Sequence, residues 1–468
     1  MVKLSVFDII IKNGKIITAN GLFDGDLAID SGVIACLGKS IENRADKIID
    51  VKGKLVLPGL VDPHVHMDFE ISGMANRDDF KSGSIAAAFS GITTIIDFAI
   101  QEKDRSALEA IKKRRKTADK KVVIDYSLHS CLTDGSERTL DEIKTIVNYG
   151  VPSFKLFMVY KKEGVMIDDG VLYTILEKVK SCGGLVGVHA ENVAIIDYLT
   201  EKYVKEGKTN AEYHAKSRPN ISEEEAIRRA VLLAKSLGAS LYIFHMSTKE
   251  GLMAVKEARD NGADILAETC PHYLTLSDEM YLRPDGNNWI MSPPLRKKED
   301  IEALWNGIIQ RYVKVIGSDH SAWDSIQKSE DSFHKVMNGV GSIETSLPLM
   351  FSEGVSNGRI SINTLIKVMS ENAAKIFGLY PQKGTLMVGS DADIVIVDPT
   401  QERTLSCDDL HMNLDYSIYE GIKVKGFPVM TISRGNIIVE NGHFQGKPGE
   451  GRFIPRKIMR KEISTNGS

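Results

Sequence analysis

The sequence predicts an α/β fold in which a (β/α)8 TIM barrel is inserted into a small β-sandwich built from both chain ends. Up to residue 58, short apolar runs are separated by turn residues, and after about residue 383 this pattern returns. Between them, apolar runs alternate with longer segments of helical period. We therefore expect a β-sandwich from residues 1–58 and 383–446, a catalytic barrel over 59–382 and a C-terminal arm over 447–468.

The two ends of the chain carry the signals of β-hairpins. Asn13-Gly14, Asn20-Gly21 and Asp30-Ser31-Gly32 each follow a short apolar run and supply residues that tight turns favour. Near the other end, residues 429–440 contain two apolar runs around Arg434-Gly435. Both ends therefore predict small antiparallel sheets.

The central region supplies eight candidate strands. They lie at 55–57, 93–98, 122–126, 153–157, 185–189, 241–245, 265–269 and 313–317. Intervening segments such as 170–181 and 223–237 are apolar at i, i+3 and i+4, as amphipathic helices are. This alternation predicts a parallel barrel, whose functional face lies at the carboxyl ends of its strands.

The composition describes an ordinary globular protein. The chain has 468 residues and a net charge of -4, which indicates neither nucleic acid nor an anionic membrane as a partner. Its five cysteines form no CxxC pair and their number is odd, which favours a reducing compartment. Asp8 stands too early for a secretory signal, and no apolar run reaches membrane-spanning length. We expect a cytoplasmic protein.

Several strand ends carry residues that can bind a metal. His64 and His66 follow the first strand at a spacing of i, i+2, which places both imidazoles on one face. His189 and His245 end two further strands, and Asp319 follows the last. Because the carboxyl ends of barrel strands meet on one face, we expect these side chains to converge on a divalent metal.

Each of these residues also has a structural interpretation. A single buried histidine is commonly a hydrogen-bonded core residue, and Asp319 alone would fit a helix N-cap. We interpret His129, His272 and His320 as structural, with His320 as a candidate support for the metal ligands. The joint occurrence of the others favours a metal site.

Lys155 is unusual because it lies in the otherwise apolar run 153–157. Burying an amine is costly unless it is paired or chemically altered. A neutral lysine amine can add carbon dioxide, and the resulting carbamate has two oxygens that can bridge two cations. This predicts a centre of two metals held by four histidines, one aspartate and a modified Lys155.

Six motifs carry a family resemblance. They are Asp62-Pro63-His64-Val65-His66, residues 154–160, 188–192, 268–271 and 292–296, and Gly317-Ser318-Asp319-His320. They resemble the cyclic amidohydrolases of the amidohydrolase superfamily, and within it the dihydropyrimidinase/D-hydantoinase subgroup. The similarity extends from about residue 7 to 445.

This resemblance implies a binuclear centre, usually of zinc, and a homotetramer. Residue by residue, it assigns His64, His66 and Asp319 to one metal and His189 and His245 to the other, bridged by N6-carboxylysine at Lys155. The implied reaction is hydrolysis of a cyclic amide by a metal-bridging hydroxide, giving an N-carbamoyl amino acid. Asp319 would take the proton of the hydroxide and pass it to the leaving nitrogen.

The resemblance also assigns three residues to the substrate. Tyr160 would stabilise the oxyanion, while Ser292 and Asn338 would bind the ring amide, largely through backbone groups. The segment 342–346 departs from the acid-plus-arginine pattern that is common after this asparagine. Loops at 67–77 and 158–166 should cover the pocket; their Met67, Phe69, Met74, Met158 and Val165 are expected to give it an apolar lining.

Three other substrate or functional classes fit the sequence less well. Dihydroorotases carry an arginine just after His-x-His, whereas Met67-Asp68-Phe69 stands here. Allantoinases share the motifs at 188–192 and 269–273, but Tyr160 and the segment 292–296 favour dihydropyrimidines and 5-substituted hydantoins. Non-catalytic relatives that serve in assembly or signalling would be expected to lack several metal ligands, and here all six are present.

Overall fold

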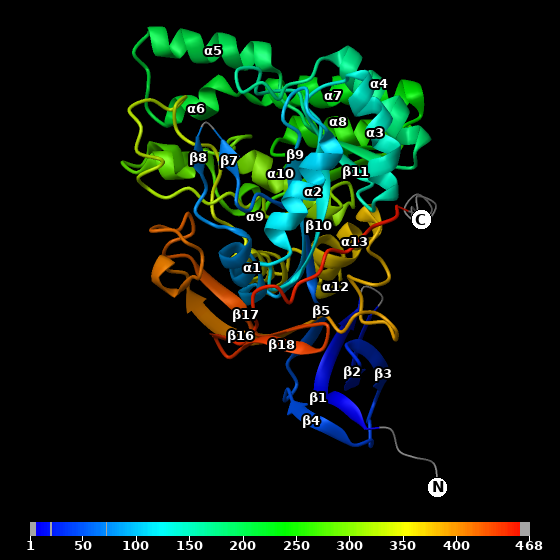
Figure 1. Ribbon diagram of the computed structural model, residues 1–468. Coiled ribbons are helices and arrows are strands. Elements are labelled where there is room, and N and C mark those ends of the chain that lie inside the picture. Colours follow the sequence, from blue (N-terminus) through cyan, green and yellow to red (C-terminus); the bar gives the residue numbers. More distant parts are fainter. Residues whose placement is uncertain (1–5, 19–20, 72, 459–468) are drawn as a thin grey trace.

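The computed structural model describes residues 6–18, 21–71 and 73–458. It contains an eight-stranded parallel sheet and a separate nine-stranded sheet. In Figure 1 the parallel sheet and its helices form the upper part of the molecule, and the nine-stranded sheet lies below it. None of the helices in the described part of the chain is long and apolar enough to cross a membrane.

The parallel sheet is a barrel that is nearly closed. Its strands are β6 (Leu60–Val65), β9 (Ile92–Ile100), β10 (Asp125–Cys131), β11 (Ser153–Phe157), β12 (Leu185–His189), β13 (Leu241–Ile243), β14 (Ile265–Thr269) and β15 (Val315–Ile316), paired in this order. Beyond β15 the chain reaches the other edge, where Val65 bridges His320 and the His66 amide donates to the His320 carbonyl at 2.8 Å. The predicted barrel is confirmed.

The first barrel strand differs from the prediction. Residues 55–57 belong to β5 (Leu55–Pro58), which pairs with strands of the other sheet, and the barrel begins with β6. Every residue of β5 is buried, so its pattern carried no information about which sheet it joins. The chain passes from one sheet to the other at Gly59, where a Cβ would lie 2.2 Å from the Thr93 hydroxyl oxygen.

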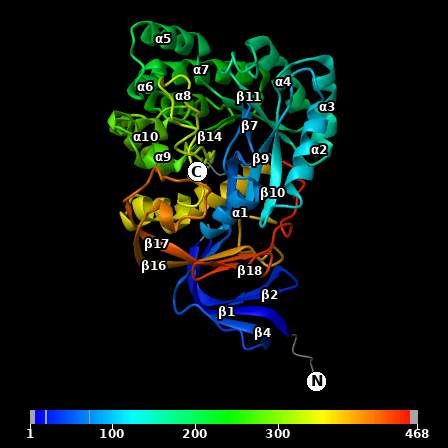
Figure 2. The same ribbon diagram turned by 60° about the vertical axis from the view of Figure 1, so that its left-hand side comes forward.

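Helices surround the barrel and also connect it to the second sheet (Figure 2). They are α1 (Phe80–Phe89), α2 (Ala107–Ala118), α3 (Glu137–Asn148), α4 (Asp169–Ser181), α5 (Val193–Lys205), α6 (Glu212–Ser217), α7 (Asn220–Leu237), α8 (Lys249–Asp260), α9 (Pro271–Thr275), α10 (Lys298–Ile309), α11 (Ser346–Met350), α12 (Ile362–Ile366) and α13 (Asn372–Phe377). The helices predicted at 170–181 and 223–237 are α4 and α7. Side chains such as Ser106, Asp168 and Thr248 cap the first turns and so fix where their helices begin.

The second sheet is built from both ends of the chain. Its remaining strands are β1 (Phe7–Thr18), β2 (Gly21–Asp30), β3 (Val33–Gly38), β4 (Ala45–Asp50), β16 (Ile394–Thr404), β17 (Lys423–Ser433), β18 (Asn436–Glu440) and β19 (His443–Phe444). The two ends of the chain meet where β5 pairs with β16. Isoleucine, valine and leucine side chains from both ends pack into one core, so neither end forms this sheet alone. The domain limits at residues 58, 383 and 446 stay predictions.

The turns at Ser31-Gly32 and Arg434-Gly435 are confirmed by the left-handed backbone that such hairpins require. Asn13-Gly14, by contrast, is not a turn. It lies inside the continuous strand β1, where Asn13 has a φ of 57° and the pairing with β2 shifts register. Because a β-bulge also favours a left-handed residue, the same sequence signal fits both structures. Asn20 lies outside the described residues.

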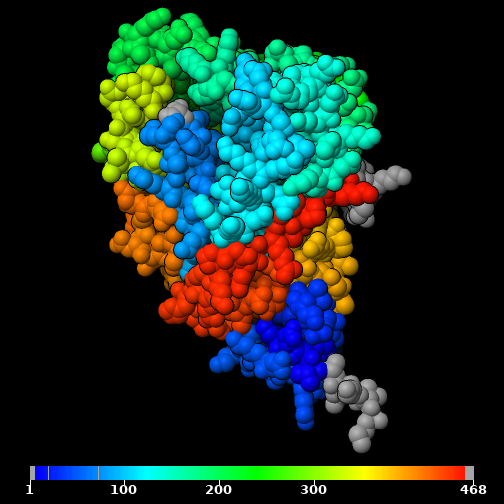
Figure 3. Space-filling view, viewed as in Figure 1, coloured from blue at the N-terminus to red at the C-terminus, as the bar shows by residue number. Residues whose placement is uncertain are grey.

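The predicted C-terminal arm follows the outside of the barrel. The red segment in Figure 3 crosses the barrel surface, and the Tyr126 amide donates to the Arg452 carbonyl at 2.9 Å. The Ile454 amide returns a hydrogen bond to the Tyr126 carbonyl at 2.7 Å. The arm is therefore ordered and packed as far as residue 458, the last described residue.

A buried ion network connects the two sheets. Lys383, only 1% exposed, contacts carboxylate oxygens of Asp125 at 2.5 Å, Asp391 at 2.9 Å and Asp393 at 2.8 Å. Arg434 also contacts Asp125, at 3.1 Å. Burial alone would lower the pKa of Lys383, but the three carboxylates hold it above its ordinary value. The network therefore attaches the amino end of the barrel to the second sheet.

Replacing the central cation should destabilise the protein. Lys383→Met leaves buried carboxylates short of a partner, and we expect the free energy of unfolding to fall by about 3 kcal/mol. Urea denaturation should show this loss, whereas Lys39→Met, at an exposed position, should unfold like the parent. Equal stability of the Lys383→Met variant and the parent would contradict this role of the network.

Candidate metal centre

The six predicted ligands lie at the carboxyl end of the barrel. The strands or the short segments that follow them supply His64 (β6), His66 (after β6), Lys155 (β11), His189 (β12), His245 (after β13) and Asp319 (after β15). Parallel strands of a barrel present this end as one face, so residues far apart in the chain come together there.

Short distances connect the six residues. Asp319 Oδ1 lies 3.0 Å from His64 Nε2 and 3.3 Å from His66 Nε2. The ring of His245 is centred 4.4 Å from that of His189 and 5.2 Å from that of His64. One ligand atom each of His64, His245 and Asp319 lies within 4.8 Å of the others. Imidazole nitrogens with a carboxylate oxygen form a donor set that suits zinc, so these residues fit a metal.

Lys155 lies at the centre of this group and is 1% exposed. Its Nζ is 3.4 Å from His245 Nε2, 3.9 Å from the centre of the Phe244 ring and 5.2 Å from that of Phe98. Burial lowers the pKa of Lys155 to about 8. Burial therefore makes the neutral form of this amine easier to reach than in a free lysine side chain.

Three residues of the site have left-handed backbones that non-glycine residues rarely adopt. The φ angles are 38° at His245, 50° at Asp319 and 68° at Tyr160. Such conformations cost about 1–3 kcal/mol each and persist only where neighbouring contacts hold them. At His245, the backbone amide donates to Glu268 Oε1 at 3.2 Å. The backbone therefore turns sharply where these side chains point into the site.

Glu268 is a supporting residue to which sequence reasoning gave no role. Its Oε1 is 2.6 Å from His64 Nδ1, and its Oε2 accepts a hydrogen bond from the Tyr242 hydroxyl at 2.9 Å. A carboxylate in this place fixes the ring and tautomer of His64, leaving Nε2 toward Asp319. The sequence does contain a signal for such a role: Glu268 is an acid within the apolar run 265–269, just as Lys155 is an amine within an apolar run.

Glu191 supports His189 in the same way. Its Oε2 is 2.7 Å from His189 Nε2 and accepts a hydrogen bond from Arg218 Nη1 at 2.6 Å. Burial alone would raise the pKa of Glu191, but Arg218 and His189 lower it to about 2. The carboxylate therefore stays ionised, and His189 is left with Nδ1 for the site.

Of the three predicted substrate residues, Tyr160 contacts this group, and Ser292 interacts with both Tyr160 and Asn338. The Tyr160 ring is centred 5.3 Å from that of His189, and Ser292 Oγ donates to Asn338 Oδ1 at 2.8 Å. Residues 342–346, which depart from the family pattern, contact the residue before Asp319. The Ser342 hydroxyl donates to the Ser318 carbonyl at 2.6 Å.

The three histidines interpreted as structural lie outside the six-residue group. His129 Nε2 contacts the Pro63 carbonyl at 2.9 Å, and His320 Nε2 contacts Asp78 at 3.1 Å. His272 is fully buried with no hydrogen-bond partner among the described residues, and it lies near Cys270 and Asp319.

A cleft of about 1240 Å³ opens between α2 and the small hairpin of β7 (Glu70–Ile71) and β8 (Met74–Ala75), and none of the predicted site residues lines it. Phe69 and Val165 line this cleft, and their expected place in the lining of the substrate pocket stays a prediction. Met67 and Met158 instead belong to the hydrophobic core, and Met74 is exposed outside the cleft. None of these three methionines lines the cleft.

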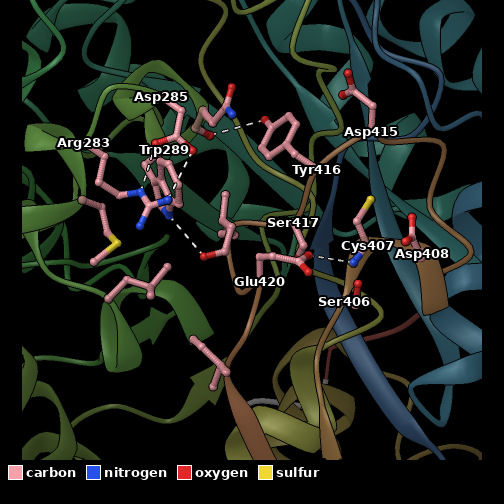
Figure 4. Close-up of a pocket in the computed structure, with 15 residues that line it drawn as sticks. Arg283, Asp285, Trp289, Ser406, Cys407, Asp408, Asp415, Tyr416, Ser417 and Glu420 are labelled. Atoms are coloured by element: carbon pink, nitrogen blue, oxygen red, sulfur yellow. Dashed lines mark hydrogen bonds and ion pairs between the residues drawn. The ribbon is translucent and has the colours of Figure 1, made fainter.

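A second groove, of about 420 Å³, lies between residues 276–289 and 406–422. Figure 4 shows Arg283 above Trp289, with its Cζ 4.9 Å from the ring centre, and paired with Asp285. This groove contains none of the predicted site residues.

Comparisons with known proteins agree with this geometry. Residues 55–438 match the amidohydrolase family. D-hydantoinase of Geobacillus stearothermophilus is 42% identical over 96% of both chains, and D-phenylhydantoinase of Escherichia coli O1:K1 is 40% identical over 96% of this chain and 98% of the relative. The crystal structure of dihydropyrimidinase from Brevibacillus agri NCHU1002 superposes with a TM-score of 0.95 at 40% identity, covering 96% of this chain and 99% of that one.

The family match covers residues 55–438, and the relatives match nearly the whole chain. The motifs that carry the family resemblance include, apart from His245, the six side chains that converge at the carboxyl end of the barrel. The protein belongs to the amidohydrolase family.

Proposed function

We propose that the protein hydrolyses the ring amide of dihydropyrimidines or 5-substituted hydantoins and releases N-carbamoyl amino acids. The observation that carries this proposal is the convergence of six side chains at the carboxyl end of the barrel, namely His64, His66, Lys155, His189, His245 and Asp319. The names of similar proteins, D-hydantoinase, D-phenylhydantoinase and dihydropyrimidinase, support this class of ring.

Two divalent metal ions, zinc by preference, complete the site in this proposal. His64, His66 and Asp319 would hold one ion, and His189 and His245 the other. A bound pair of this kind supplies Lewis-acid activation of water and of the substrate carbonyl. The contacts of His64 with Glu268 and of His189 with Glu191 favour this use, since metal-binding histidines commonly donate their second nitrogen to a carboxylate.

Lys155 would bridge the two ions as a carbamate. The neutral Nζ forms a bond to the carbon of carbon dioxide and gives up one proton, and the ammonium form must first lose another. The change from a cation to an anion with two oxygens therefore releases two protons. The pKa of about 8 supports this step, because the neutral amine is the reactive form. The modification also relieves the burial of a cation between the Phe98, Phe157 and Phe244 rings.

Two side chains act directly on the reacting atoms. The Asp319 carboxylate, beside His64 and His66, takes a proton from the attacking water and returns it to the leaving ring nitrogen. Burial raises the pKa of Tyr160, so its phenol stays protonated and can donate a hydrogen bond to the oxyanion that forms on the substrate carbonyl.

The backbone at Ser292 is prepared to bind the ring amide. The carbonyls around it accept hydrogen bonds from buried side chains: Ile290 from Lys328 at 2.6 Å, Met291 from His214 at 2.7 Å and Pro293 from Tyr273 at 2.6 Å. Within the described residues the Ser292 carbonyl and the Asn338 amide have no such partner. One acceptor and one donor thus stay available, as a ring amide requires.

We further propose a homotetramer in the cytoplasm. Large apolar side chains are exposed on the barrel helices, with Tyr198 66%, Leu232 67% and Met253 52% exposed. Apolar side chains in such positions fit contacts between copies of the chain. Cytoplasmic location is supported by the five cysteines, all of which are free thiols.

A substrate panel tests the proposal. Zinc-loaded protein should open dihydrouracil and 5-phenylhydantoin but not dihydroorotate, because no cation follows His66 to hold a carboxylate. Ring opening can be followed by chromatography of the N-carbamoyl product, with Asp319→Asn as an inactive control. Turnover of allantoin alone would contradict the assigned ring class, and no turnover of any ring by metal-loaded protein would contradict the function.

The carbamate gives a separate prediction. Lys155→Ala should lower kcat by at least about 100-fold and reduce bound metal, since the bridge is lost. A short carboxylic acid such as propionate should restore part of both, because its two oxygens can take the place of the carbamate. Lys144→Ala, at an exposed position on α3, should behave like the parent. Full activity of Lys155→Ala without added acid would rule out the carbamate.

A further inference from the structure

An arginine from the C-terminal segment enters the amino end of the barrel. The backbone around Arg456 runs along the outside, and its amide donates to the Gly150 carbonyl at 2.9 Å. The Arg456 side chain nevertheless turns inward and is only 3% exposed. Barrel interiors are ordinarily filled by branched apolar side chains, so a guanidinium in this layer is unusual.

The guanidinium is hydrogen-bonded without a matching anion. Its Nε donates to Ser127 Oγ at 2.7 Å, Nη1 to the Phe377 carbonyl at 3.1 Å, and Nη2 to Ser153 Oγ at 2.8 Å and to the Leu128 carbonyl. Among the described residues no carboxylate pairs with it, and burial lowers its pKa to about 9. Burying a cation in this way is costly, so stability alone is a weak reason for its presence.

The hydrogen bonds beyond Arg456 can run in only one direction. A carbonyl only accepts, so His129 Nε2, which lies 2.9 Å from the Pro63 carbonyl, carries the hydrogen. Burial lowers the pKa of His129 well below its ordinary value, so the ring is neutral and its bare Nδ1 accepts from the Ser153 hydroxyl at 2.7 Å. Ser153 Oγ in turn accepts from the Arg456 guanidinium, which has donors and no acceptor. The donors are therefore Arg456, Ser153 and His129, and the Pro63 carbonyl is the final acceptor.

Two members of this relay, Pro63 and Ser153, lie close in the chain to residues of the metal centre. Pro63 immediately precedes His64, so the last hydrogen bond holds the peptide that carries this ligand. Ser153 lies two residues before Lys155, on the same face of β11. Stacked rings also connect His129 to the metal centre. The Phe98 ring is centred 4.9 Å from that of His129 and 4.8 Å from that of His66.

We propose that Arg456 is a positioning residue for the metal centre. Through Ser153 and His129 the C-terminal segment holds the backbone of His64, and through Ser153 it holds β11 at Lys155. This inference rests on the proposed function, since it assigns a task toward the bound metals. A role in stability alone would lower the melting temperature without changing how folded protein retains metal.

Metal release from the full-length holoenzyme distinguishes the two roles. The Arg456→Met and Ser153→Ala variants should lose metal to a chelator about tenfold faster than the parent at a temperature where all are folded. Ser153→Ala leaves the contacts of Arg456 with Ser127 and Leu128 in place. This variant therefore interrupts the relay without releasing Arg456 from the barrel. Lys457→Met, at an exposed neighbouring position, should release metal at the parent rate.

The combined variant tests whether the two residues act through one path. If they do, Arg456→Met with Ser153→Ala should release metal no faster than either single variant, and the visible spectrum of the cobalt-substituted forms should shift alike in all three. Parent-like release and spectra in folded Arg456→Met and Ser153→Ala variants would overturn the inference. A parent protein that holds no metal would overturn the proposed function itself, and this is seen before any variant is made.

Discussion

The burial of an amine among aromatic rings is the constraint on which the rest of the site depends. A cationic Lys155 between Phe98, Phe157 and Phe244 has no carboxylate at hydrogen-bonding distance among the described residues, and desolvating such a charge costs several kcal/mol. The four histidines around it cannot supply a negative charge. The proposed carbamate and two cations would meet both requirements, because the modified lysine would become an anion and the imidazoles would gain the partner they suit.

A second set of groups makes this arrangement rigid. Glu268 and Glu191 hold one nitrogen of His64 and His189, and Arg218 holds Glu191 in turn. Glu268 also accepts from the His245 amide, and the Ser342 hydroxyl donates to the Ser318 carbonyl, so these contacts hold the sharp backbone turns at His245 and Asp319. Preorganised ligands of this type favour tight binding and directed chemistry.

Much of the fold and of the candidate site could be predicted from the sequence. The strand at 153–157 and the helix at 170–181 were predicted correctly because their patterns of apolar residues are clear. Residues at the carboxyl ends of barrel strands could be predicted to lie together because the barrel topology alone brings those ends to one face. The assignment of 55–57 to the barrel was wrong because a strand buried on both faces carries no signal of its sheet. The supporting role of Glu268 depends on hydrogen bonds between separate strands, which spacing along one chain does not reveal.

The C-terminal segment shows the same limit more strongly. A tail rich in glycine, proline and basic residues predicts an exposed arm, and its backbone does lie outside the barrel (Figure 3). Nothing in that composition distinguishes Arg456 from its exposed neighbours, yet among the cations of the tail up to residue 458 it alone is buried in the barrel. Burial of a single charged side chain is a property of the assembled fold.

The most direct test of this account is anomalous diffraction from crystals of the zinc-loaded protein, recorded on both sides of the zinc absorption edge. The account predicts two zinc peaks, one among His64, His66 and Asp319 and one beside His189 and His245, with density for a carbon dioxide adduct on Lys155 between them. A single peak, peaks outside this group, or an unmodified lysine between two zinc ions would contradict it.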